Sequence, residues 1–171
     1  MTTYKSNAFC GFTAIKCVYT NLCGTSLSYI FDNYTDVLTI YGVGNMYNYT
    51  IDSVPWISFK DFMKSVVISY GVESIVNNAF SNRNELSSIT IPSSVKSIGN
   101  FAFSNCSNLD SVTYNGINDP GINSNAFYDC NKLIKVNLHA NFIVKIYSTC
   151  KLNQLVTNNS NTIICFHNFK I

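Results

Sequence analysis

The sequence contains few charged residues, no cluster of lysine and arginine, and no long apolar run. Only 12% of its 171 residues are charged, and the formal net charge is +2. A charge so small and so dispersed provides no electrostatic footprint for nucleic acid. No segment approaches the roughly 20 apolar residues that a membrane helix needs, and the first residues lack the apolar core of a signal peptide. We therefore expect no nucleic-acid partner and no membrane insertion of this chain.

Residues that commonly build active sites are also scarce. His139 and His167 are the only histidines, and neither has a serine or cysteine nucleophile motif nearby. Gly42-Val43-Gly44 follows a predicted strand, but it lacks the third glycine and the helix of a nucleotide-binding loop. We interpret it as a bend. The sequence predicts a non-enzyme that uses no cofactor and no metal.

What the sequence does contain is one short pattern written three times between Met63 and Lys132. The copies run MKSVVISYGVESIVNNAFSNRNE, LSSITIPSSVKSIGNFAFSNCSN and LDSVTYNGINDPGINSNAFYDCNK. Their first residues, together with Leu133 at the start of a fourth unit, are 23, 23 and 24 residues apart. A fixed period of this size is typical of a solenoid, in which each unit is stable only when its neighbours cover its apolar faces.

Each unit reads as a strand, a turn, a second apolar group and a closing Ala-Phe pair. In the second unit Leu86, Ile89 and Ile91 are apolar and alternate with polar residues from Ile89 onward, as in a strand with one buried face. The unit ends on Ala102-Phe103, and we expect the phenylalanines of successive units to stack in the core. The predicted repeat core comprises Ile68, Ile75, Phe80, Ile91, Ile98, Phe103, Ile122 and Phe127.

Residues 86–108 closely resemble the BspA-like (Treponema-type) leucine-rich repeat, with the pattern L-x-x-I-x-I-P-x-x-V-x-x-I-G-x-x-A-F-x-x-C. The resemblance spans most of the chain. It implies a leucine-rich-repeat solenoid that is rich in β-structure, with short helical or 3-10 turns on its convex side. It also implies a role at the cell surface, because the family is found on surfaces of bacteria and parasitic protists and is associated with adhesion.

The segments around the repeats have their own patterns. Ala8-Phe9 has the form of a closing pair, so the chain is expected to begin inside a repeat, as a fragment of a longer array does. After Cys23 the repeat register breaks, and two alternating stretches around a polar turn predict a β-hairpin that, with Trp56, shields the first repeat. We expect four segments: a partial repeat at 1–22, a cap-like β-hairpin module at 23–62, repeats comprising three full units and a fourth strand at 63–138, and a divergent C-terminal unit or tail at 139–171.

Seven cysteines are present, and none of them forms a C-x-x-C pair. Cys10, Cys17 and Cys23 lack both a fourth ligand and the usual spacing of a zinc site. Cys106 and Cys130 occupy the same place in adjacent units, and neighbouring strands lie about 4.8 Å apart, so a disulfide is geometrically feasible. The alternative is two buried thiols packed as small apolar groups.

Strand residues that face away from the core should form rows of small polar side chains on one concave sheet, a surface suited to binding another macromolecule. Pro92 falls in the third row. The candidate binding face otherwise comprises Ser65, Ser88, Ser111 and Lys135 in one row, Val67, Thr90, Thr113 and Asn137 in the next, and Ser69, Asn115 and His139 in the third. A solvated face without a ligand is the alternative.

Two functions remain open on the sequence. The first is a non-catalytic module for cell-surface adhesion or for host or matrix binding, with a protein or glycan ligand. The second is an intracellular, cytoplasmic scaffold for protein–protein interaction, favoured by the missing signal peptide and by thiols that look free. A truncated fragment of a longer repeat protein, without a function of its own, is the third reading.

Overall fold

The computed structural model describes residues 7–10, 17–118, 120–122, 125–133, 135–139, 156–157 and 163–164. Its largest element is an eight-stranded sheet in the order β1-β2-β3-β4-β6-β8-β10-β11. The strands are β1 (Asn7–Cys10), β2 (Cys17–Leu22), β3 (Leu27–Asp32), β4 (Val37–Gly42), β6 (Ser65–Ile68), β8 (Ser88–Ile91), β10 (Ser111–Tyr114) and β11 (Lys135–Leu138).

A second, three-stranded sheet is built from the apolar groups that follow the main strands. It consists of β5 (Gly44–Asn45), β7 (Val72–Ile75) and β9 (Ser97–Ile98), and its strands are parallel. The remaining elements are the 3-10 helix η1 (Ile57–Phe59) and the antiparallel pair β12 (Val156–Thr157) and β13 (Ile163–Ile164).

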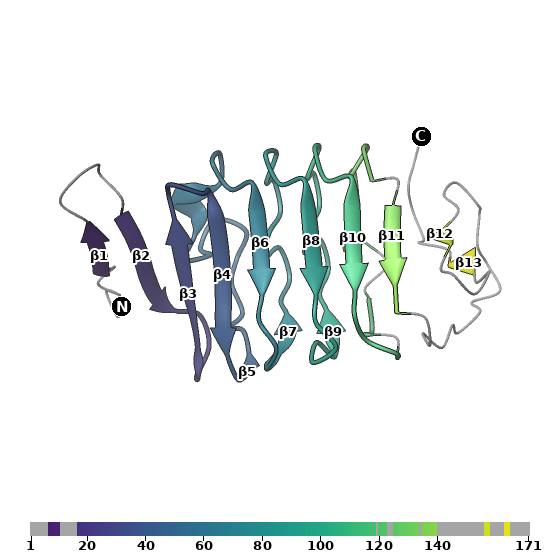
Figure 1. The fold of residues 1–171 in the computed structure, drawn as a ribbon, viewed down its shortest axis with the longest axis horizontal. Helices are drawn as coiled ribbons and strands as arrows, with labels where there is room; N and C mark the ends of the chain where they lie inside the picture. The colour runs from purple at the N-terminus through teal and green to yellow at the C-terminus, as the bar shows by residue number, and fades with distance from the viewer. Residues whose placement is uncertain are drawn as a thin grey trace.

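The predicted repeats form a parallel ladder in exact register with the sequence period. Strands β4, β6, β8, β10 and β11 run side by side in one direction (Figure 1). Ser65 pairs with Ser88, and Ser88 pairs with Ser111, so each partner lies one period further along the chain. This ladder, together with the expected strand after Leu133, was readable from the repeat alone because apolar alternation specifies register.

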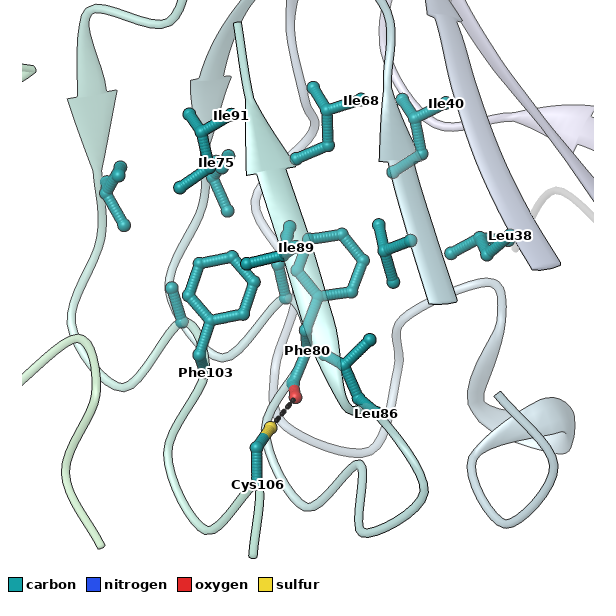
Figure 2. Packing of buried hydrophobic residues seen from close by; sticks show 14 of the residues in the cluster. Leu38, Ile40, Ile68, Ile75, Phe80, Leu86, Ile89, Ile91, Phe103 and Cys106 are labelled. Atoms are coloured by element: carbon teal, nitrogen blue, oxygen red, sulfur yellow. Dashed lines mark hydrogen bonds between the residues drawn. The ribbon is translucent and has the colours of Figure 1, made fainter. Parts of the chain in front are cut away.

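A column of stacked aromatic rings fills the core behind this ladder. The ring centroids of Phe80 and Phe103 are 5.3 Å apart, with nearly parallel planes (Figure 2). Those of Phe103 and Phe127 are 5.1 Å apart, and their planes are also nearly parallel. Phe80 and Phe103 are fully buried. Trp56 extends the column by stacking on Phe80 at 5.4 Å, and its indole Nε1 donates a hydrogen bond to the carbonyl of Ala79.

The residues assigned to the repeat core lie among buried apolar side chains, with one difference. Ile122 is only partly buried, although it packs against the core and its backbone bridges to Ile98. The other seven are at most 5% exposed: Ile68, Ile75, Phe80, Ile91, Ile98, Phe103 and Phe127.

The turns that close each unit are not helical. Among the described residues the only helix is η1, whereas residues 77–85 and 99–105 form hydrogen-bonded turns. Asn82, Asn105 and Asp129, at equivalent places in three units, all have φ between 55° and 60°. Asparagine and aspartate tolerate this left-handed region better than other non-glycine residues, which explains their recurrence there. The expected helical turns are therefore not found in the described part of the repeat units, since η1 lies before Met63.

The predicted β-hairpin is present, but its second strand also belongs to the ladder. Strands β3 and β4 pair antiparallel, with Leu27 opposite Gly42. Strand β4 then pairs in parallel with β6, with Val37 beside Ser65 and Ile40 beside Ile68. The repeat register, which breaks after Cys23 in the sequence, therefore resumes at Val37, and its longer spacing hides it from a search for a period of 23.

The N-terminal strands differ from the expected repeat stub. Ala8 and Phe9 lie in β1, which pairs antiparallel with β2, and Val18 pairs with Asp32 of β3. An Ala-Phe pair that closes a repeat would instead lie in a turn, as Ala79 and Phe80 do. Residues 1–22 therefore contribute an antiparallel extension of the sheet wherever they are described.

We expect Phe103→Ala to lower the free energy of unfolding by about 3–5 kcal/mol, because the ring is stacked on both sides and no solvent-facing group can fill the space. Urea unfolding of the 171-residue chain measures the loss. Phe62→Ala is the control, since that ring is 61% exposed and its removal should change stability by less than about 0.5 kcal/mol. If Phe103→Ala lowered the free energy of unfolding by less than about 1 kcal/mol, the ring column would not be a main source of stability.

Phe101 has φ 55°, in the place where the preceding unit has Asn78 at φ 57°. A bulky side chain in this region costs about 1–2 kcal/mol, and its edge-to-face contact with Tyr128 returns about 0.5–1.5 kcal/mol. We expect Phe101→Asn to raise the melting temperature modestly, by a net gain of up to about 1 kcal/mol. The reverse change Asn78→Phe should lower the melting temperature. A melting temperature that changes in neither variant would show that the strained backbone at these positions is unimportant for stability.

Candidate functional site

The exposed side of the large sheet brings the predicted face residues together in rows. Ser88 lies between Ser65 and Ser111, and Thr90 lies between Val67 and Thr113, each pair joined by in-register backbone pairing. The ladder continues into β11, where Lys135 pairs with Ser111 and Asn137 with Thr113. We call this surface, made by the outward residues of β4, β6, β8 and β10 and by their continuation in β11, the row face.

Strand alternation decides which side chains reach the row face. Val66, Ile89 and Val112 point into the core and are at most 3% exposed. Their neighbours Val67 and Thr90 are exposed, and Val67 is 45% exposed. Each side chain on this face therefore stands about one strand spacing from its equivalents in the adjacent strands.

Side-chain hydrogen bonds also cross the row face. The amide of Asn137 donates to the hydroxyl of Thr113 over 3.0 Å. Similar bonds join equivalent residues on the turns, where the Asn105 amide donates to Asn82 over 3.0 Å. Asn137 and Thr113 thus form a hydrogen bond across neighbouring strands of the row face, one period apart.

The outward side chains of β4, β6, β8 and β10 include no charged group. The sequence prediction missed the contribution of β4, because Val37, Thr39 and Tyr41 belong to the hairpin rather than to a recognisable unit. Tyr41 is 38% exposed and adds an aromatic ring to the rim of the surface. The contribution of β4 could have been predicted from the apolar alternation of Leu38 and Ile40, which matches that of the repeat strands.

The third predicted row lies just beyond the strand ends. Ser69, Asn115 and His139 each donate a backbone hydrogen bond to the strand before them, at 2.9, 3.0 and 3.2 Å. Pro92, which shares this row in the sequence, is buried, so it is not part of the surface. A proline has no N–H to donate, and its ring instead packs inward at this position.

Cys106 and Cys130 are free, fully buried thiols in this structure. The Cys106 sulfur donates to the carbonyl of Phe80 over 3.1 Å (Figure 2), and the Cys130 sulfur donates to the carbonyl of Phe103 over 2.9 Å. Each thiol thus satisfies the carbonyl of the stacked phenylalanine in the preceding unit. The reading of these residues as buried thiols matches the structure, although they act as donors and not only as apolar groups.

Arg83 occupies the place of Cys106 and Cys130 in the first unit. Its side chain is 1% exposed, and Nη1 donates to the carbonyl of Ser81 over 2.6 Å. Nε and Nη2 have no hydrogen-bond partner. Burial lowers the pKa of Arg83, and electrostatic interactions with Cys106 and Asp61 oppose this by raising it. A buried cation with two unpartnered donors is costly, because desolvation is not offset by pairing.

The other candidate sites do not assemble into a reactive centre. Gly42 and Gly44 both have φ 112°, and a Cβ on Gly42 would lie 2.1 Å from the carbonyl of Ser26, so the Gly-x-Gly motif is a tight bend. Within the described ranges, no group of three or more His, Cys, Asp or Glu could hold a metal ion. His167 lies outside the described residues, as do the side chains of Cys10 and Cys17. Burial raises the pKa of the Cys23 thiol to about 12.

The part of the chain that the structure describes includes no helix with the length and apolarity needed to cross a bilayer.

Comparison with known families decides which class of protein this ladder represents. Residues 57–171 match the BspA type leucine-rich repeat region, in six copies. The chain belongs to this family. The match extends through residues 139–171, which the sequence reading assigns to a divergent unit or tail.

A solved structure supports the fold of this BspA-type chain. The crystal structure of a leucine-rich repeat protein from Eubacterium ventriosum matches with a TM-score of 0.51 and 20% sequence identity. The match covers 72% of this chain and 45% of that protein, so the chain spans less than half of its length. Among curated proteins, no relative matches this chain.

We expect Cys106→Ala to lower the free energy of unfolding by about 1–3 kcal/mol, because the buried carbonyl of Phe80 would lose its donor. Cys106→Ser should recover part of this loss, since its hydroxyl can donate to the same carbonyl. Chemical unfolding of both variants checks the order, with the exposed Ser107→Ala as a control expected within about 0.5 kcal/mol of the unaltered chain. Equal losses for serine and alanine would mean that the thiol contributes only volume.

Proposed function

We propose that this BspA-type repeat chain is a non-catalytic interaction module that binds a partner protein through its row face. The single observation that supports this function is the in-register, uncharged surface spanning β4, β6, β8 and β10. Extended regular surfaces of repeat arrays suit binding to another macromolecule. A partner that lies across the ladder meets serine and threonine hydroxyls on β6, β8 and β10, with Val67 and Tyr41 among them.

The row face also supplies places where binding energy can concentrate. Val67 is 45% exposed in the centre of the surface and Tyr41 is 38% exposed at its rim. Tyrosine is enriched among residues that dominate binding energy, and apolar groups surrounded by hydroxyls bury well against a partner. We infer that Val67 and Tyr41 anchor the partner, while Ser88, Thr90 and Thr113 supply complementarity.

We further propose that residues 23–62 act as a cap for the repeats. Three contacts support this role: Trp56 stacks on Phe80, the Tyr29 hydroxyl donates to the carbonyl of Pro55, and the rings of Phe31 and Phe59 stack at 4.2 Å. The first contact reaches the repeats, and the other two tie the hairpin to the segment that carries Trp56, as expected of a segment that covers the open end of the first repeat.

Two features of the chain support two different cellular locations for this module. The family resemblance supports adhesion at the cell surface with a host or matrix ligand. The free thiols Cys23, Cys106 and Cys130 support a second candidate, an intracellular scaffold, because persistent thiols are typical of reducing compartments. Antibody staining of unpermeabilised cells separates the two, and absence of the protein from the surface would exclude adhesion.

We expect Thr90→Arg to weaken binding of the recombinant chain to immobilised matrix proteins by about tenfold or more, because it places an unpaired charge in the middle of the row face. Surface plasmon resonance measures the change. Asn84→Arg is the matched control, since this exposed residue lies on the turns away from the sheet and its substitution should leave binding intact. Equal affinities for both variants would exclude the row face as the binding surface.

A further inference from the structure

The turns that carry Cys106 and Cys130 are laid directly on one another by backbone hydrogen bonds. Phe103 N–H donates to the carbonyl of Ala126, and Asn105 N–H donates to the carbonyl of Tyr128, each over 2.8 Å. Bonds of this kind hold two backbones at about the 4.8 Å spacing of paired strands. This spacing falls within the range of about 4.4–6.8 Å between Cα atoms that a disulfide requires.

The two thiols also act on each other's ionisation. The S–H of Cys130 donates to the carbonyl of Phe103, and a side-chain hydrogen bond with Cys130 acts on the Cys106 thiol. This hydrogen bond lowers the pKa of Cys106, whereas the same contact and burial raise the pKa of Cys130. Cys106 therefore loses its proton first, which makes it the nucleophile of the pair.

Arg83 supplies the third part of the arrangement. Its buried guanidinium is at the position in the first unit that is equivalent to Cys106 and Cys130. Two of its nitrogens have no hydrogen-bond partner. The charge of Arg83 lowers the pKa of Cys106, and so does a hydrogen bond from the backbone of Arg83. The other charged groups that act on this column are Asp61, which acts on Arg83, and Asp129, which acts on Cys130. A cysteine anion is thus the natural counter-charge for this buried cation.

We propose that Cys106 and Cys130 form a modification site, at which a low-molecular-weight disulfide oxidises the two thiols to one disulfide bond across neighbouring repeats. The Cys106 thiolate attacks one sulfur of the reagent, whose S–S bond breaks and releases one thiolate. Cys130 loses its proton, attacks the Cys106 sulfur and displaces the second thiolate. The released thiolates take up the two protons lost by the cysteines, so two cysteines are oxidised as one reagent disulfide is reduced.

The oxidised bond would change the core as well as cross-link it. It removes both S–H donors, so the carbonyls of Phe80 and Phe103 lose the hydrogen bonds that they accept in the reduced protein. It also fixes the register of two units covalently. Because both sulfurs are buried, the reagent reaches them only when a turn opens, and the reaction is expected to be slow compared with that of an exposed thiol. This site is independent of the proposed function of the row face.

The test uses the full chain, incubated under native conditions in mixtures of reduced and oxidised glutathione. The protein is then denatured in N-ethylmaleimide and digested with trypsin. Cleavage after lysine releases residues 97–132, a peptide that contains Cys106 and Cys130 and no other cysteine. We expect this peptide to appear without label and lighter by two hydrogen atoms as the mixture becomes oxidising. A doubly labelled peptide at every ratio, or a bond to another peptide, would overturn the proposal.

Variants separate the parts of the mechanism. Cys130→Ser should accumulate a glutathione adduct on Cys106, and Cys23→Ser, which removes another buried thiol, should leave the cross-link unchanged. Arg83→Met should slow oxidation at neutral pH by about threefold for each unit of pKa gained by Cys106 and move the rate profile to higher pH. An unchanged profile would remove Arg83 from the mechanism. The wild-type peptide decides the site itself, whether or not Arg83→Met folds.

Discussion

The stacking of one aromatic ring per turn is the interaction on which the rest of this structure depends. Trp56, Phe80, Phe103 and Phe127 form a column with ring centroids 5.1–5.4 Å apart. That spacing is close to the distance between neighbouring strands, so one ring per unit fills the space behind one strand without gaps. Any unit alone would expose both faces of its ring. The column therefore makes the folding of neighbouring units cooperative.

The ring column buries backbone carbonyls, and side chains of two cysteines and Trp56 donate hydrogen bonds to them. The carbonyls beside the rings are buried, and each needs a donor. The thiols of Cys106 and Cys130 donate to the carbonyls of Phe80 and Phe103. The indole N–H of Trp56 donates to the carbonyl of Ala79. The small thiols fit between the turns because neighbouring turns are joined by backbone hydrogen bonds. In the first unit Arg83 takes the place equivalent to Cys106 with a larger, charged group, and its Nε and Nη2 have no hydrogen-bond partner.

The row face is a consequence of the same regularity on the other side of the sheet. Once the apolar side chains of each strand point toward the rings, the alternate residues must line up outward in rows. On β4, β6, β8 and β10 these outward residues carry no charge, which leaves this part of the ladder open to contact along its length. In this protein the surface available for a partner is therefore an outcome of the packing, whereas the choice of partner rests on a few side chains such as Val67 and Tyr41.

The sequence by itself determined the period, the strands, their parallel register and the inward or outward direction of each side chain. These features follow from local alternation repeated at a fixed spacing, which is visible without coordinates. The hairpin at 27–41 was equally readable, because its strands and its turn are contiguous. The rows containing Ser88 and Thr90 could be predicted for the same reason, since a register shared by identical units places equivalent residues side by side.

Only the tertiary structure decided the features that depend on contacts between dissimilar segments. It showed that β4 joins the ladder, that Trp56 takes the place of a phenylalanine, and that Ala8 and Phe9 lie in an antiparallel strand. It also showed that Pro92 is buried and that Arg83 lies in the cysteine column. None of these follows from a period, because each depends on how a non-repeating segment packs against a repeating one, and packing is set by shape and burial in three dimensions rather than by spacing along the chain.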